Sequence, residues 1–368
     1  MNNKTEYKEL IAFHPGYYIA DMIEELEISQ EEFAARMGTT GKTISKLVNG
    51  QSNLTKELAQ KLSNMFGTSV DVWLNLQTKY DEKILEIERK KEVDEQADIM
   101  KLIDYSYFVK VAGLPMTRSV EEKISNLCSY LMVSDLRVFG KSNLLVCFRT
   151  GISNVKPKNI INAQIWVQTA LNFAKKLEVN KFDADKLRKS LPAIRDLTVE
   201  QPNEFLPKLE RIFLGCGVSF VLLPHLKNSG VNGAVKWYGQ GHVLLAINDR
   251  RCFSDVFWFS LFHEIGHVLQ QKVKKVFISS DIKDMGTVDT VLERDADEFA
   301  QNYLVPKKEY DKLIKSKFIS DDQIVEFSGK IGIHPGIVAG RLQHDGIIPQ
   351  NRCATVLTHT TDRSTLIP

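Results

Sequence analysis

Two histidines four residues apart, in a stretch without proline, constrain the fold of this chain more than any other feature. The stretch is His263-Glu264-Ile265-Gly266-His267, and it follows an apolar run at residues 257–262. In a helix, a spacing of four places both imidazoles on one face, one turn apart. The apolar run is sufficient to bury one face of that helix. We therefore expect a long helix from Ser254 through Gln271 that presents both histidines together.

Two imidazoles and one carboxylate form a common catalytic zinc set, which leaves the fourth coordination position for water. Glu264 follows His263 directly, so it flanks the metal where a general base must stand. We expect the third ligand on a nearby helix, where Glu293 is the candidate. Carboxylates on exposed helix faces are common, so this assignment depends on the histidines. Asp297 shares the helix face of Glu293. It is expected to accept a hydrogen bond from the N–H of a ligating histidine and so to fix the tautomer of that ring.

The sequence also predicts the chemistry of such a site. Zinc would polarise a scissile carbonyl and lower the pKa of its water, and Glu264 would take the proton and return it to the leaving amine. A donor to the tetrahedral oxyanion is also needed. His334 and Tyr303 are the candidates, and a packing role is an equally good interpretation of each.

A small sheet is expected ahead of the histidine helix. Residues 218–223, 233–238 and 242–248 have strand patterns, and Gly239-Gln240-Gly241 is typical of a hairpin turn. A sheet followed by helices indicates an α+β domain. An extended substrate could pair with strand 242–248 or with its hairpin partner by strand addition.

Residues 160–350 resemble the ImmA/IrrE metallopeptidase family. The motifs that carry the resemblance are FWFSLFHEIGH at 257–267, E-x-x-A-D-x-F-A at 293–300, LVP at 304–306 and IHPGIVAGRLQH at 333–344. The resemblance implies a gluzincin-like fold, bound Zn²⁺, and cleavage of a transcriptional repressor or antitoxin. Val305 stands where many members have Met, which is a conservative difference.

Residues 1–80 have the pattern of short helices separated by tight turns. Ser29 with Glu32 forms a capping-box pattern, and Thr40 is the expected N-cap of the next helix, which ends at Asn49-Gly50. Two short helices joined by a turn of about four residues, in a small helical bundle, are typical of a helix-turn-helix.

Residues 14–80 also resemble the Xre-type, HigA-like antidote family. The matching motifs are HPG at 14–16, SQEEFA at 29–34, TISKLVNG at 43–50 and WLNLQ-x-x-YD at 73–81. The recognition helix and the start of the helix before it supply the expected DNA contacts: Gln30, Thr40, Lys42, Thr43, Ser45 and Lys46. A solvated, helical protein-binding module is the alternative.

Charge is segregated in this region. Residues 36–61 contain five Lys or Arg against one acid, whereas residues 6–32 contain eight acids against one Lys. The acidic side should therefore face away from phosphates. The whole chain has a net charge of only +2, which demands neither a nucleic acid nor a membrane. Tight operator binding is therefore expected to need a homodimer.

A chain of 368 residues is expected to be multidomain. We predict a helix-turn-helix domain at 1–80, a helical linker at 81–159, the metallopeptidase domain at 160–350 and a C-terminal tail at 351–368. The five cysteines are spread without a C-x-x-C pair, which favours buried thiols in a reducing cytoplasm. No apolar run approaches the ~20 residues that cross a bilayer, and no secretory signal is apparent.

These patterns predict a cytoplasmic transcriptional regulator that binds operator DNA and uses zinc to cleave a repressor or antitoxin-type protein. Its own linker near residues 80–100 is a second candidate substrate. The alternative is a non-enzymatic, HigA-like antitoxin or repressor, in which the zinc domain senses a signal or binds a toxin partner. A structural zinc site needs neither Glu264 nor an open coordination position, and this favours the enzyme.

Overall fold

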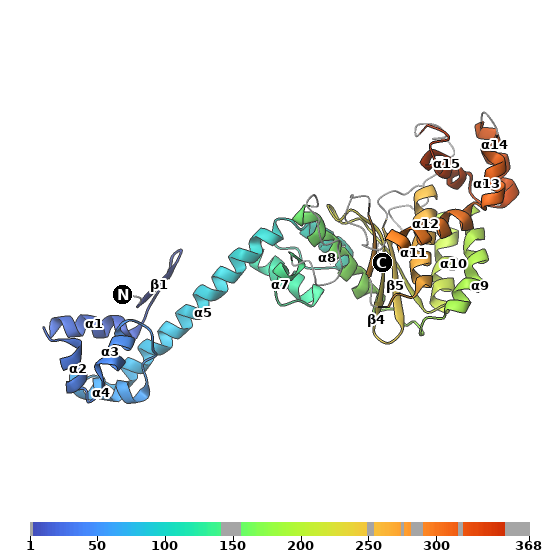
Figure 1. Cartoon of the computed structure of the whole chain (residues 1–368). Helices are drawn as coiled ribbons and strands as arrows, with labels where there is room; N and C mark the ends of the chain where they lie inside the picture. The colour runs from blue at the N-terminus through green and yellow to red at the C-terminus, as the bar shows by residue number, and fades with distance from the viewer. Residues whose placement is uncertain are drawn as a thin grey trace. The chain divides into compact units, whose positions relative to one another are not determined.

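A computed structural model describes residues 3–140, 156–248, 254–273, 276–280, 290–315 and 319–349 of the chain. Contacts within the chain divide it into two compact units, residues 1–98 and 99–368 (Figure 1). Each unit is described by itself. The predicted tail at 351–368 lies outside the described residues, as do Cys147, Cys252 and Cys353.

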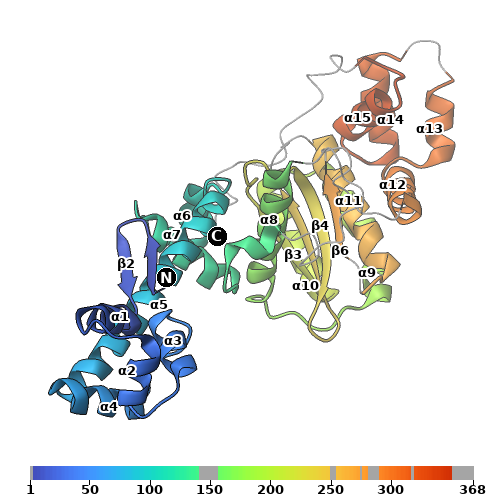
Figure 2. The ribbon, with the colours of Figure 1, turned by 60° about the vertical axis from the view of Figure 1, so that its left-hand side comes forward.

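The first unit begins with an antiparallel hairpin of β1 (Lys4–Tyr7) and β2 (Leu10–Phe13) (Figure 2). The sequence did not predict this hairpin, because strands of four residues are too short for a clear alternating pattern. The helices that follow confirm the predicted helical bundle: α1 (Pro15–Glu25), α2 (Gln30–Arg36), α3 (Gly41–Val48), α4 (Lys56–Phe66) and α5 (Val70–Met100).

The predicted N-caps hold the two helices of the helix-turn-helix. Ser29 Oγ accepts from the Glu32 amide at 3.1 Å, and Thr40 Oγ1 accepts from the Thr43 amide at 3.2 Å. Only half of the predicted capping box is present, since the Glu32 carboxylate contacts Arg36 instead of the Ser29 backbone. Each cap satisfies an amide that the first helical turn leaves without a partner.

Close packing explains two of the sequence motifs in this unit. A Cβ on Gly16 would lie 1.9 Å from the Leu47 carbonyl oxygen, so the HPG motif lets α1 lie directly against α3. Trp73 is buried and donates from Nε1 to Thr68 Oγ1 at 2.8 Å. Gln77 Oε1 accepts from the Leu54 amide at 2.8 Å, so the WLNLQ run fixes the start of α5 to the loop before α4.

The second unit is mostly helical and contains a small mixed sheet. Most residues of the helix at Pro157–Ala174 are buried, including the polar Asn162 and Thr169. None of the described helices is long and apolar enough to cross a membrane. The helices that precede the sheet are α6 (Tyr105–Ala112), α7 (Val120–Leu131), α8 (Pro157–Ala174), α9 (Ala184–Asp196) and α10 (Pro202–Gly215), with 3-10 turns at Leu136–Gly140 and Leu197–Val199.

The sheet has the order β3-β5-β4-β6. Strands β3 (Val218–Leu223) and β5 (His242–Asn248) are parallel, and β4 (Val231–Tyr238) is antiparallel to both β5 and β6 (Val276–Ser280). The three predicted strands are confirmed, and β6 was missed. The prediction that β5 or β4 receives a substrate strand is wrong, because both strands are paired on both sides. Among the described strands, β6 forms the edge on this side of the sheet.

Helices α11 (Ser254–Gln270) and α12 (Thr290–Leu304) confirm the two predicted helices that carry the histidines and Glu293. A Cβ on Gly266 would lie 3.2 Å from the Ala296 Cα, so this glycine allows the two helices to approach closely. The helices that complete the chain's described part are α13 (Lys307–Leu313), α14 (Asp321–Ile331) and α15 (Pro335–His344).

Candidate functional site

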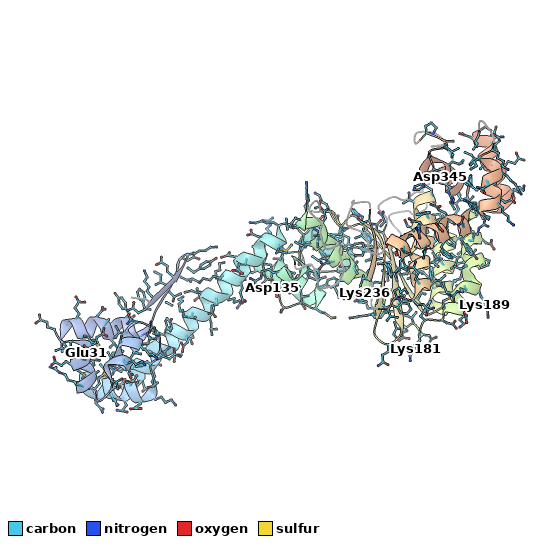
Figure 3. All side chains as sticks on the ribbon, in the orientation of Figure 1. Glu31, Asp135, Lys181, Lys189, Lys236 and Asp345 are labelled. Atoms are coloured by element: carbon cyan, nitrogen blue, oxygen red, sulfur yellow. The ribbon has the colours of Figure 1, made fainter. Side chains whose placement is uncertain are left out.

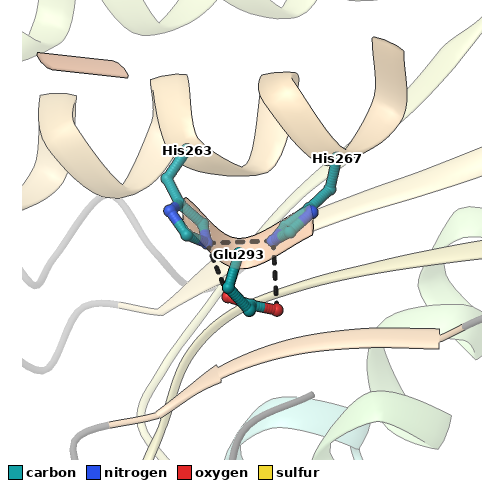
Figure 4. A group of neighbouring side chains, drawn as sticks. All are labelled: His263, His267 and Glu293. Carbon is teal, nitrogen blue, oxygen red and sulfur yellow. Dashed lines mark hydrogen bonds and ion pairs between the residues drawn. The ribbon is translucent and has the colours of Figure 1, made fainter. Parts of the chain in front are cut away.

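Three side chains from α11 and α12 converge on one point. One ligand atom from each of His263, His267 and Glu293 lies within 4.8 Å of the others (Figure 4). The two Nε2 atoms are 3.0 Å apart, and each lies 3.4 Å from an oxygen of Glu293. Around a tetrahedral zinc ion with bonds of about 2.0–2.2 Å, ligand atoms lie roughly 3.3–3.5 Å apart. The three residues therefore have the donor types for zinc, and the two distances to Glu293 match this spacing, whereas the distance between the Nε2 atoms is shorter.

The second nitrogen of each histidine ring contacts an oxygen. His263 Nδ1 lies 2.8 Å from Asp297 Oδ1, and His267 Nδ1 lies 2.9 Å from Gln270 Oε1. Gln270 Nε2 donates to the Leu292 carbonyl at 2.7 Å, which turns its oxygen toward the ring. These contacts place a proton on each Nδ1 and leave both Nε2 lone pairs for a metal. Asp297 occupies its predicted position, whereas sequence reasoning missed Gln270.

Charge and burial also favour a cation at this point. Burial lowers the pKa of His263, but contacts with Asp297 and Glu293 outweigh it and raise the pKa to about 10. Burial raises the pKa of Glu293, but the two histidines outweigh it and lower the pKa to about 2. His267 is fully buried, and the Phe277 ring of β6 stacks on it at 4.1 Å between centroids. The carboxylates therefore create a negative field in a buried site.

Glu264 is fully buried and lies between α11 and the sheet. A Cβ on Gly233 of β4 would lie 2.5 Å from Glu264 Oε1 and 2.8 Å from its Cγ. The absence of a side chain at Gly233 therefore provides the space for this carboxylate. Glu264 is outside the three-residue group, and its charge contributes to the raised pKa of His263. It stands beside the group, as a general base must.

A cavity of about 470 Å³ opens beside the three-residue group. His263 and Glu293 line it from α11 and α12, Ile278 lines it from β6, and Arg341 lines it from α15. Both apolar and charged side chains therefore surround the candidate metal centre, as is common in sites that bind a ligand.

The structure places neither predicted oxyanion donor in the wall of this cavity. His334 Nδ1 accepts from the Gly336 amide at 3.0 Å and caps α15. The Tyr303 ring stacks on Phe262 with centroids 5.4 Å apart. These contacts give His334 a capping role and Tyr303 a packing role, and the oxyanion role of either residue stays a prediction.

The candidate nucleic-acid interface lies on α3. Ile44, Leu47 and Val48 are buried in the bundle, whereas Lys42 and Lys46 are exposed. Neither lysine forms an ion pair with a described residue, whereas Arg36 and Lys61 pair with Glu32 and Glu57. The other predicted contacts lie at the helix starts or are half-buried: Gln30 is the first residue of α2, Thr40 is the N-cap of α3, and Thr43 and Ser45 follow in α3.

Comparisons with known proteins concern this N-terminal region. The model of the helix-turn-helix family matches residues 19–73. The uncharacterized HTH-type transcriptional regulators YddM and YbaQ of Escherichia coli K12 are 39% and 33% identical over 79 and 76 residues. The matches cover 20% and 21% of this chain, and 84% and 66% of the two relatives. A putative antidote protein of a plasmid maintenance system from Nostoc punctiforme is 34% identical, covers 23% of this chain and 92% of its own, and has a TM-score of 0.22.

Proposed function

The chain belongs to the helix-turn-helix family through its N-terminal residues, and we propose that it is a transcriptional regulator that binds operator DNA and carries a zinc peptidase. Lys42 and Lys46 are exposed and form no ion pair with a described residue. They support the DNA-binding half, since they can contact phosphates or base edges from α3. The low net charge of the chain supports a homodimer on the operator, because few phosphate contacts per copy give weak binding.

The observation that carries the peptidase half is the convergence of His263, His267 and Glu293 with Glu264 alongside. Zinc held by these three ligands would supply a Lewis acid and activate water near neutral pH. Asp297 and Gln270 orient the two imidazoles. Glu264 accepts the proton of the attacking water and passes it to the leaving amine. The gluzincin-like fold and the ImmA/IrrE assignment are part of this proposal.

The sheet edge supports an extended protein substrate. Strand β6 is the edge strand, and Ile278 within it lines the cavity. A segment that adds to β6 would run past His263 and Glu293 and bind through main-chain hydrogen bonds. Residues 80–100 lie within α5, whose backbone bonds are made inside the helix. The substrate is therefore a separate repressor or antitoxin-type protein with an extended segment.

The test is cleavage of the regulator or antitoxin encoded beside this protein by the full chain loaded with zinc. The proposal expects cleavage products with the parent and with Glu298→Gln, an exposed glutamate on α12. It expects no products with Glu264→Gln. Cleavage that persists in Glu264→Gln would refute the peptidase. If the parent and both variants bind the operator but none cleaves, the chain is the non-enzymatic, HigA-like repressor or antitoxin.

A further inference from the structure

Arg341 of α15 lines the wall of the cavity and contacts two neighbouring side chains. Its Nε donates to Asp345 Oδ2 at 2.9 Å, and its guanidinium carbon lies 4.6 Å from the centre of the Tyr310 ring. The Tyr310 hydroxyl donates to the same Asp345 oxygen at 2.6 Å. Asp345 ends α15 and is labelled in Figure 3. The side chain of Arg341 is only 15% exposed.

A close contact between helices brings Arg341 to this position. A Cβ on Gly340 would lie 2.5 Å from the Asp255 Cβ on α11, so α15 packs directly against the helix that carries the histidines. Arg341 and His263 therefore line the same cavity. The arrangement depends on glycine at position 340, because any larger residue would push α15 away.

The Nη1 atom of Arg341 is buried and has no hydrogen-bond partner in the described part of the chain. A buried donor without a partner costs roughly 1–3 kcal/mol, and more for a charged group, so such atoms are rare without a reason. The Nε side of the guanidinium is already occupied by Asp345, which balances its charge. The two Nη groups are therefore the part of the guanidinium that remains for a ligand.

From these contacts we infer that Arg341 is a substrate-positioning residue whose guanidinium donates to a main-chain carbonyl of the bound peptide. The inference rests on the proposed peptidase function. A neutral carbonyl suits the site better than a carboxylate, because Asp345 already balances the guanidinium. In addition, Asp255, Glu293 and Asp297 line the same cavity and would repel an anion.

Two zinc-binding probes separate this role from that of the metal centre. Acetohydroxamate offers only the zinc-binding group, whereas a succinyl hydroxamate joined to an Ala-Ala amide also offers main-chain carbonyls. Affinities are measured with the zinc-loaded full chain. We expect Arg341→Gln and Arg341→Lys to lower the affinity for the peptide probe by about ten-fold or more, because each variant loses a hydrogen bond from a charged group. Acetohydroxamate should bind all variants equally.

Lys330→Gln is the matched control, since it removes one positive charge from α14 at an exposed position. It should leave both affinities unchanged. Arg341→Lys keeps the positive charge and the aliphatic stem. It therefore still tests the inference if Arg341→Gln fails to fold. An unchanged peptide affinity in Arg341→Lys, or an equal loss for both probes, would overturn the inference. Failure of both probes to bind the zinc-loaded parent would overturn the metal centre and the inference with it.

Discussion

Gly233 of β4 lies directly against the carboxylate of Glu264, at a distance that leaves no room for a Cβ. The strand and the helix therefore jointly fix the position of the proposed general base. Gly233→Ala should displace this carboxylate, because the added methyl would lie 2.5 Å from Oε1. We expect cleavage to fall at least ten-fold while zinc content stays near that of the parent, since no ligand is altered.

The control for that variant is Gly329→Ala on α14, where an added Cβ meets nothing within 4 Å. Cleavage rates and zinc content are measured together on both proteins. If Gly233→Ala cleaved as fast as Gly329→Ala, the contact between Gly233 and Glu264 would have no role in the reaction.

Asp297 should affect zinc binding through His263. Asp297→Asn removes the negative charge of the group that accepts a hydrogen bond from His263 Nδ1. The imidazole therefore becomes less basic, and the tautomer that binds zinc through Nε2 is less strongly favoured. We expect zinc affinity to fall about 10- to 100-fold, as is usual when such a partner is removed. Competition with a chromophoric chelator measures the affinity. Asp295→Asn, at an exposed position of the same helix, is the control and should match the parent.

Gly16 should be essential for the first unit. In Gly16→Ala the new methyl would lie 1.9 Å from the Leu47 carbonyl oxygen, and a backbone atom cannot yield as a flexible side chain can. We expect a loss of about 3 kcal/mol in the stability of this unit, together with weaker operator binding. Hydrogen exchange of α3 amides in the full chain measures the stability. Gly41→Ala, whose Cβ would lie 3.6 Å from Glu31 Cγ, should exchange like the parent.

His14 should make α1 sensitive to acid. Burial lowers the pKa of this imidazole, and its Nδ1 accepts from the Gly16 amide at 3.0 Å. The stability that depends on neutral His14 is therefore complete above the unfolded pKa of about 6.5 and declines as the pH falls below it. Hydrogen exchange of α1 amides, corrected for intrinsic rates, should show less protection at pH 5.5 than at pH 7.5.

The control is His14→Asn, because asparagine can also cap a helix but does not titrate in this range. Its α1 protection should change little between the two pH values. Equal pH dependence in the parent and in His14→Asn would show that another group is responsible.

The sequence predicted the elements that have strong local signals. Helices α11 and α12 were predictable from apolar periodicity, and the caps Ser29 and Thr40 from their hydroxyl side chains. Strand β6 was missed because five residues cannot distinguish a strand from other apolar segments. Pairing order is a non-local property, so the sequence misplaced the sheet edge on β5 or β4.

The candidate site shows the same limit. The i, i+4 spacing joined His263 to His267, and the helix face joined Glu293 to Asp297. Gln270 could have been noticed at three residues past His267, where a helical side chain reaches back to the ring. Residues that come together from distant segments of the chain show no such local spacing in the sequence. The position of Arg341 depends on Asp345 and Tyr310, and the cap that His334 forms on α15 was not predicted from the motif.

The metal content of the purified full chain tests the central claim most directly. After exhaustive dialysis against buffer with trace zinc, elemental analysis should find about one zinc ion per chain in the parent and in Glu298→Gln. Glu293→Gln should retain almost none, because loss of one of three protein ligands leaves an incomplete set. A parent without zinc, or a Glu293→Gln variant that keeps a full equivalent, would contradict the assignment of His263, His267 and Glu293 as the zinc centre.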